Sequence, residues 1–191
     1  MPAPRAALLD DYQGVALDMA DWAPLDGRVA LDVFRRHIDG EDQLVAELAP
    51  YEIVVAMRER APFPRSVLER LDNLKLLVTT GPRNAAIDVA AAREAGIMVC
   101  GTGGDVHSTS ELTWALILAC VRQLPTEVAN VRRGGWMTTV GGDLDGRTLG
   151  LLGLGRIGAL VGAVGRAFGM ELIAWSQNLT PSAAPSTRPP W

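Results

Sequence analysis

Short apolar runs alternate with amphipathic stretches along the first hundred residues. The apolar runs, rich in β-branched residues, occupy 6–12, 29–34, 52–57, 74–80 and 97–102. The stretches between them place apolar residues three and four positions apart, as one face of a helix requires, over 40–51, 64–73 and 87–96. Strands that alternate with short helices predict a parallel α/β sheet with right-handed crossovers. Five strands in about 100 residues indicate a small flavodoxin-like domain.

The pattern then changes to a long apolar helix. Residues 108–124 (STSELTWALILACVRQL) are apolar on every face in their middle. This predicts a helix that is buried on more than one side, between domains or subunits. Ser108 followed by Glu111 fits a capping box at the start of this helix. A second helix is expected over 126–136, where two glycines close it.

From about Asp145 the pattern predicts a new β-α-β unit. A strand, a helix and a second strand are expected in turn over 147–155, 156–169 and 170–176. The residues from 180 onward differ from the rest, because they carry four prolines and no periodicity. We expect this tail to be disordered.

A glycine motif lies at the turn between that strand and that helix. Gly153, Gly155 and Gly158 form the pattern G-x-G-x-x-G. The first glycine allows the tight turn, the second lets the backbone approach a pyrophosphate, and the third lets helix and strand pack closely. The helix, starting with Arg156 and Ile157, offers free N–H groups to the phosphates. The motif therefore predicts a dinucleotide site for NAD or NADP.

The second strand leaves the choice between the two dinucleotides open. An Asp or Glu at its end would bind the ribose 2′-OH of NAD, but this position is Ser176. A small polar group does not repel the 2′-phosphate of NADP. No well-placed arginine would hold that phosphate, since Arg188 lies in the tail.

Composition excludes several other classes of protein. A formal net charge of −4 disfavours a nucleic-acid partner. The longest apolar run, 114–121, is too short to cross a membrane, and the N-terminus has no apolar segment typical of a signal peptide. Cys100 and Cys120 lack metal-ligand spacing, so no metal site is expected. We predict that both are buried free thiols of a cytoplasmic protein.

Four stretches resemble one family of enzymes, the D-isomer-specific 2-hydroxyacid dehydrogenases. They are LKLLVTTGPRNAAIDVAAAREAGIMVCGT, STSELTWALILACVRQLP, RRGGWMTTVGGDLDGRTLGLLGLGRIG and GAVGRAFGMELIAWS. The resemblance implies a small substrate domain and a Rossmann domain, with the active site between them. It also implies hydride transfer between a nicotinamide cofactor and a 2-keto or 2-hydroxy acid, usually in a homodimer.

The resemblance also implies a division of the chain. The flavodoxin-like substrate domain would span 1–104, and the interdomain helix with the start of the Rossmann domain would span 105–179. Residues 180–191 would be a tail outside the family pattern. The family's catalytic arginine and histidine lie in N-x-S-R-G and P-H-x-G contexts, and neither string occurs in this sequence. We therefore expect no catalytic residue here, and a truncated chain that is inactive alone.

The same resemblance implies where a substrate acid would bind. The loop from Gly81 to Asn84 would receive the carboxylate on its backbone N–H groups. Pro82 departs from this pattern because it has no N–H, which leaves Gly81, Arg83 and Asn84 as donors. The Arg83 side chain would add a charge-assisted contact. Arg58, at the end of the third strand, is a further candidate, because ligands of open α/β sheets bind at the carboxyl edge.

Three residues complete the candidates near the expected active site. Thr109, at the start of the interdomain helix, is expected to touch the nicotinamide end of the cofactor. His107 precedes that helix, but we do not expect it to be catalytic, because the sequence supplies no carboxylate partner for it. His37 follows two arginines and is expected on the surface.

A non-catalytic alternative stays open at this point. The chain could be a binding module that takes a small acid or pairs with another chain through the apolar face of 114–121. The glycine motif favours the dehydrogenase interpretation, since a module of this kind would have no use for it.

Overall fold

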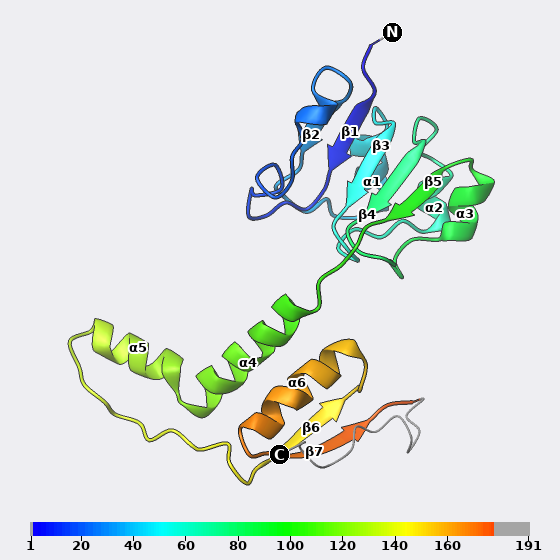
Figure 1. Cartoon of the computed structure of the whole chain (residues 1–191). Coiled ribbons are helices and arrows are strands. Elements are labelled where there is room, and N and C mark those ends of the chain that lie inside the picture. The colour runs from blue at the N-terminus through cyan, green and yellow to red at the C-terminus, as the bar shows by residue number, and fades with distance from the viewer. Residues whose placement is uncertain (1, 178–191) are drawn as a thin grey trace. The chain divides into compact units, whose positions relative to one another are not determined.

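The computed structural model describes residues 2–177 and divides the chain into two compact units (Figure 1). The first unit is Met1–Gly104 and the second is Asp105–Trp191. The predicted tail from 180 onward lies outside the described residues. No helix among residues 2–177 is long and apolar enough to span a membrane.

The first unit is built on a five-stranded sheet in which every strand pair is parallel. Its strands stand in the order β2-β1-β3-β4-β5, which is the flavodoxin-like order. The strands are β1 (Arg5–Leu8), β2 (Ala30–Val33), β3 (Ile53–Ala56), β4 (Leu76–Thr79) and β5 (Met98–Gly101). The predicted fold class is confirmed. Each predicted run overlaps one strand and extends beyond its end, and β1 begins at Arg5, one residue before its run.

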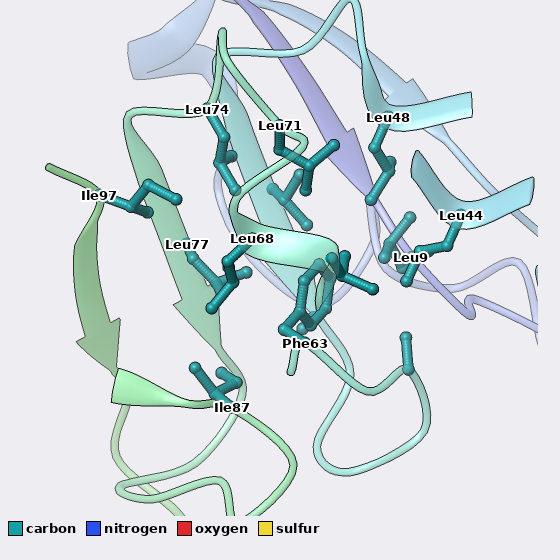
Figure 2. Packing of buried hydrophobic residues seen from close by; sticks show 14 of the residues in the cluster. Leu9, Leu44, Leu48, Phe63, Leu68, Leu71, Leu74, Leu77, Ile87 and Ile97 are labelled. Atoms are coloured by element: carbon teal, nitrogen blue, oxygen red, sulfur yellow. The ribbon is translucent and has the colours of Figure 1, made fainter. Parts of the chain in front are cut away.

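Three helices follow β2, β3 and β4, and their buried side chains pack against one face of the sheet. They are α1 (Glu41–Leu48), α2 (Arg65–Leu68) and α3 (Val89–Glu94). Phe63 is fully buried in this core, among Leu44 from α1 and Leu68 from α2 (Figure 2). Alternation along the strands selects this face: Val54 and Leu77 point into the core.

The intervening strand residues point to the opposite face. Ile53, Val55, Leu76 and Val78 line an apolar hollow of about 680 Å³. The segment between β1 and β2, including a short 3₁₀ helix (Ala23–Leu25), borders this hollow. One face of the sheet thus packs against the helices in the core, and the other face lines this apolar hollow.

The second unit contains the predicted β-α-β arrangement. Strand β6 (Thr148–Leu152), helix α6 (Arg156–Ala167) and strand β7 (Glu171–Trp175) follow in sequence, and the two strands pair in parallel. Two helices precede them, α4 (His107–Val121) and α5 (Leu124–Arg132). Trp114 of α4 joins the two parts: its indole N–H donates to the Val161 carbonyl (3.2 Å), and its ring lies 5.0 Å from that of Phe168.

Within the second unit, α4 is buried on one side only, so its predicted burial between domains or subunits stays a prediction. Ser110 and Trp114 are its buried residues, whereas Leu112 and Leu116 are 60% and 58% exposed. The helix packs on α6 through one side. Uniform apolarity along a helix predicts burial but does not specify which segment covers the helix, and no other element of the second unit up to residue 177 covers the exposed side.

The predicted capping box at the start of α4 is wrong. The Asp105 carboxylate accepts hydrogen bonds from the backbone N–H groups of His107 (3.0 Å) and Ser108 (3.2 Å) and from the Ser108 hydroxyl (2.9 Å). These hydrogen bonds lower the pKa of Asp105 to about 2. Asp105 therefore caps the helix as a charged group, and Ser108 and Glu111 lie inside it.

The predicted burial of the two cysteines is wrong as well. Cys100 and Cys120 are exposed free thiols. Cys100 belongs to β5, the last strand of the sheet, and Cys120 belongs to the turn of α4 near its end. Apolar neighbours in the sequence suggested burial, but in both cases the side that would cover the thiol is open.

Candidate functional site

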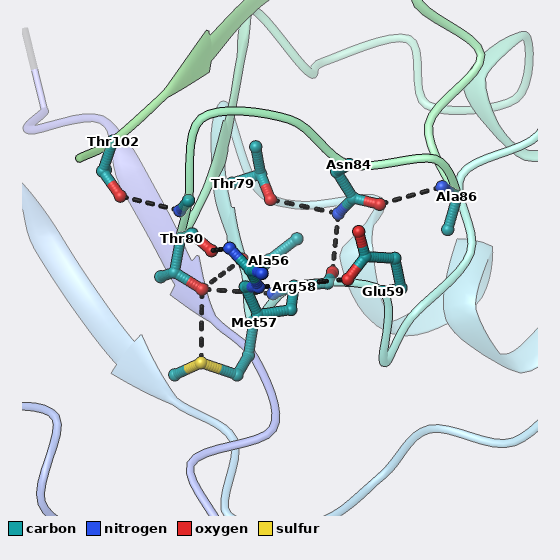
Figure 3. Close-up of polar contacts among 10 residues, drawn as sticks. Ala56, Met57, Arg58, Glu59, Thr79, Thr80, Asn84, Ala86 and Thr102 are labelled. Carbon is teal, nitrogen blue, oxygen red and sulfur yellow. Dashed lines mark hydrogen bonds and ion pairs between the residues drawn. The ribbon is translucent and has the colours of Figure 1, made fainter. Parts of the chain in front are cut away.

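The loop after β4 brings together most of the residues predicted to bind the acid (Figure 3). Gly81 has φ = 126°, a region that favours glycine. A Cβ atom at this position would overlap the Arg58 guanidinium. Glycine is therefore required here twice: for its backbone conformation, and for the space that lets Arg58 lie directly against the loop.

Arg58 is held in place by the chain that follows β4. It has φ = 52°, its backbone N–H donates to the Thr80 hydroxyl (3.1 Å), and its Nη1 donates to the Thr80 carbonyl (3.4 Å). Its Nε lies 4.0 Å from a Glu59 carboxylate oxygen, and its side chain is half-exposed. A left-handed arginine at the carboxyl end of a central strand is the kind of backbone strain that occurs at functional sites.

Gly81 and Asn84 form hydrogen bonds with other residues of the protein. The Gly81 N–H already donates to the Thr102 hydroxyl (2.8 Å). The Asn84 amide donates to the Arg58 carbonyl (2.6 Å) and accepts from the Ala86 N–H (2.9 Å). These two residues therefore shape the loop. Arg83 is exposed, and the described residues offer no hydrogen bond to its side chain or its N–H.

A second polar cluster lies at the same edge of the sheet, after β1, and sequence reasoning missed it. Asp10 is 2% exposed with φ = 58°, and its Oδ1 accepts from the Tyr12 hydroxyl (2.9 Å) and lies 2.9 Å from His37 Nδ1. Arg60 donates to the Asp10 carbonyl (2.8 Å) and lies over the Tyr12 ring. His37 is therefore not a plain surface residue. A histidine paired with a buried aspartate has no signal in sequence spacing.

In the second unit, the three glycines lie at the turn between β6 and α6 and at the start of α6, as their spacing predicted. Gly153 has φ = 104°, and its N–H donates to the Trp175 carbonyl (2.7 Å). A Cβ atom on Gly158 would overlap the Gly153 carbonyl, so helix and loop meet backbone to backbone. A Cβ atom on Gly155 would meet nothing within 4 Å. This open space at the start of α6 fits a dinucleotide phosphate.

The other cofactor candidates divide into two groups. Arg156 and Ile157 begin α6 and, with the glycines, line a hollow at the loop. Ser176 follows β7 directly and is half-buried. Thr109 does not line this hollow; Val106 and Thr113 do, and the Thr113 hydroxyl donates to the Thr109 carbonyl (2.8 Å). The contact of Thr109 with the nicotinamide end of the cofactor therefore stays a prediction.

A flavodoxin-like sheet followed by a glycine loop of this geometry defines a dinucleotide-binding α/β protein. Residues 114–188 match the family model described as "D-isomer specific 2-hydroxyacid dehydrogenase, NAD binding domain". The chain belongs to this family of dehydrogenases, as its sequence motifs predicted. NAD or NADP is the cofactor of the matched domain. The match also covers part of the tail set apart from residue 180.

Individual relatives agree with this assignment. The chain is 31% identical over 159 residues to D-3-phosphoglycerate dehydrogenase of Rattus norvegicus, covering 82% of this chain and 30% of the relative. It is 34% identical over 162 residues to hydroxypyruvate reductase of Thermotoga maritima, covering 83% and 52%. The crystal structure of phosphoglycerate oxidoreductase from Vibrio cholerae superposes with a TM-score of 0.84 at 36% identity, covering 92% and 56%. The chain thus spans about half or less of the relatives it matches.

Proposed function

We propose that the chain forms the acid-binding domain and the first cofactor-binding unit of an NAD(P)-dependent 2-hydroxyacid dehydrogenase. One observation carries this proposal: the same chain contains two candidate sites of the kinds that such an enzyme needs. At the carboxyl edge of the first sheet, Arg58 lies against the loop at Gly81, and the glycine loop of the second unit has room for a phosphate. The bound cofactor would exchange a hydride with a 2-keto or 2-hydroxy acid.

The chain's own residues would bind and orient both molecules. The backbone N–H groups of Arg83 and Asn84 and the guanidinium groups of Arg58 and Arg83 would hold the acid. Gly153, Gly155 and Gly158, with the start of α6 at Arg156 and Ile157, would hold the pyrophosphate. Ser176 would face the ribose, and Thr109 or Thr113 the nicotinamide end.

The acid-binding role predicts a clear effect of Arg58. Replacing Arg58 with glutamine should weaken binding of a 2-keto acid such as pyruvate about tenfold, because a charge-assisted hydrogen bond is worth about 1.5–3 kcal/mol. Titration of the loop amide signals in nuclear magnetic resonance spectra would measure this. Arg70→Gln is the matched control, since Arg70 pairs with Asp42 on the surface of the same unit. Equal affinities of both variants would contradict the role of Arg58.

We also propose that these 191 residues alone do not turn over substrate. The N-x-S-R-G and P-H-x-G contexts of the catalytic arginine and histidine are absent from the sequence. Without a proton donor at the acid, bringing cofactor and substrate together is not sufficient. NADH oxidation by the pure chain with a panel of 2-keto acids should equal the rate without protein. A protein-dependent rate that survives repeated purification would refute this.

One observation favours a second function, a non-catalytic module that pairs with another chain. The apolar residues Leu112, Leu116, Leu124, Val128 and Val131 are exposed on α4 and α5. The same surface supports the homodimer expected for the family. NADH binding at the glycine loop would favour the dehydrogenase over this alternative. A cytoplasmic location stays a prediction from the sequence.

A further inference from the structure

Thr102 links the candidate acid-binding loop to the segment that connects the two units. It follows β5 directly and stands just before Asp105, where the second unit begins. Its hydroxyl accepts a hydrogen bond from the Gly81 N–H (2.8 Å) (Figure 3). Its own N–H donates to the Gly81 carbonyl (3.0 Å) and to the Thr79 carbonyl (3.2 Å). Thr102 and Gly81 are therefore joined in both directions.

The same hydroxyl also contacts the connecting segment, Gly103 and Gly104, which leads to the second unit. It donates to the Gly103 carbonyl (3.1 Å) while it accepts from Gly81. A hydroxyl can do both at once, and each hydrogen bond polarises the other. One oxygen atom thus connects the first peptide of the loop with the first peptide of the connecting segment.

The packing around this contact leaves little freedom. A Cβ atom on Gly101 would lie 2.8 Å from the Gly81 carbonyl oxygen and 3.1 Å from that of Pro82. On the other side, Arg58 occupies the space against Gly81. The Gly81 peptide is therefore confined between Arg58 and the end of β5, and its N–H is oriented by the Thr102 hydroxyl. The Gly81 peptide is the start of the chain segment that carries the N–H groups of Arg83 and Asn84.

We propose that Thr102 is a positioning residue. Its hydroxyl holds the Gly81 peptide in the conformation in which the loop binds a carboxylate, and through this hydroxyl the binding of an acid at the loop changes the surroundings of Gly103 and Gly104. The inference rests on the proposed function, since it requires that the loop binds an acid. An acid that binds better to this shape of the loop than to others would stabilise the Thr102 contacts. The connecting segment would then respond to substrate through a direct chain of hydrogen bonds.

The test compares three forms of the full 191-residue chain, the wild type, Thr102→Val and Thr102→Ser, each labelled with ¹⁵N and titrated with pyruvate. In the wild type, the amide signals of Arg83, Asn84, Gly103 and Gly104 should shift with one common midpoint. Thr102→Val keeps the shape of threonine but loses the hydroxyl. Its midpoint should rise about threefold to tenfold, the effect of one hydrogen bond, and the two glycine signals should no longer move. Thr102→Ser restores the hydroxyl and should behave as the wild type.

Thermal unfolding of each form separates positioning from loss of fold. If Thr102→Val does not fold, Thr102→Ala takes its place against Thr102→Ser. If the variant without the hydroxyl binds pyruvate as tightly as the wild type and its glycine signals still shift, the inference is overturned while the acid-binding loop stands. If pyruvate shifts no loop signal in the wild type, the proposed acid site fails and this inference fails with it.

Discussion

The Gly155→Ala variant should have the same unfolding temperature as the wild type but bind NADH about tenfold more weakly. Gly155 has φ = −82°, which alanine adopts without strain, and a Cβ atom there meets no protein atom within 4 Å. The added methyl group would instead occupy the space at the start of α6 into which a phosphate must come. Each charge-assisted hydrogen bond lost to the helix N–H groups is worth about 1.5–3 kcal/mol.

This prediction separates binding from folding in one substitution. Binding is measured from the shifts of the amide signals of residues 153–158 on addition of NADH, and stability from thermal unfolding. Gly103→Ala is the control, since a Cβ atom on Gly103 also meets nothing within 4 Å, but it lies in the first unit. If Gly155→Ala binds NADH as well as the wild type, the pyrophosphate does not lie against this glycine, and the cofactor proposal loses its main support.

A Gly158→Ala chain should lose both stability and NADH binding. Here the Cβ atom would overlap the carbonyl oxygen of Gly153, a backbone atom that cannot rotate away. The start of α6 must therefore move off the glycine loop. Forcing extra volume into a well-packed site costs about 1–3 kcal/mol, and we expect the upper part of this range because the contact is between backbones. Amide exchange in β6 should become faster by a corresponding factor.

Gly162→Ala is the matched control, because Gly162 lies on the same helix, α6. A Cβ atom on Gly162 would lie 3.2 Å from side-chain methyl groups of Leu151 and Leu172, which can adjust. Alanine also favours the helix by about 1 kcal/mol over glycine. This variant should keep NADH binding and lose little stability. Equal behaviour of Gly158→Ala and Gly162→Ala would show that the close approach of Gly158 to the loop is not needed.

The features predicted correctly from sequence are those set by local pattern. Alternating apolar runs specify strands, and the composition between them specifies helices, so the five-stranded parallel sheet and the β6-α6-β7 unit could be predicted. The glycine motif could be predicted because each of its positions favours glycine for a local reason. Gly153 has a positive φ, Gly158 lies against the Gly153 carbonyl, and Gly155 leaves open space at the start of α6.

The features that failed depend on which segments meet in space. Exposure of Cys100 and Cys120 depends on what covers the edge of the sheet and the outer side of α4, and their sequence neighbours do not tell this. Asp105 caps α4 because the helix begins at His107, two residues earlier than a capping box at Ser108 requires. A shift of two residues along a helix changes which side chain reaches the free N–H groups.

For this protein, the sequence by itself determined the class of fold, the glycine loop and the family, because these follow from short-range patterns. Only the tertiary structure decided how the candidate acid-binding loop is built. In the structure the Gly81 N–H donates to the Thr102 hydroxyl, and the Asn84 amide donates to the Arg58 carbonyl. The Arg58 side chain lies against Gly81. These contacts join segments about twenty residues or more apart in the chain. Their partners are chosen by the pairing of strands, which brings distant strand ends to one edge of the sheet.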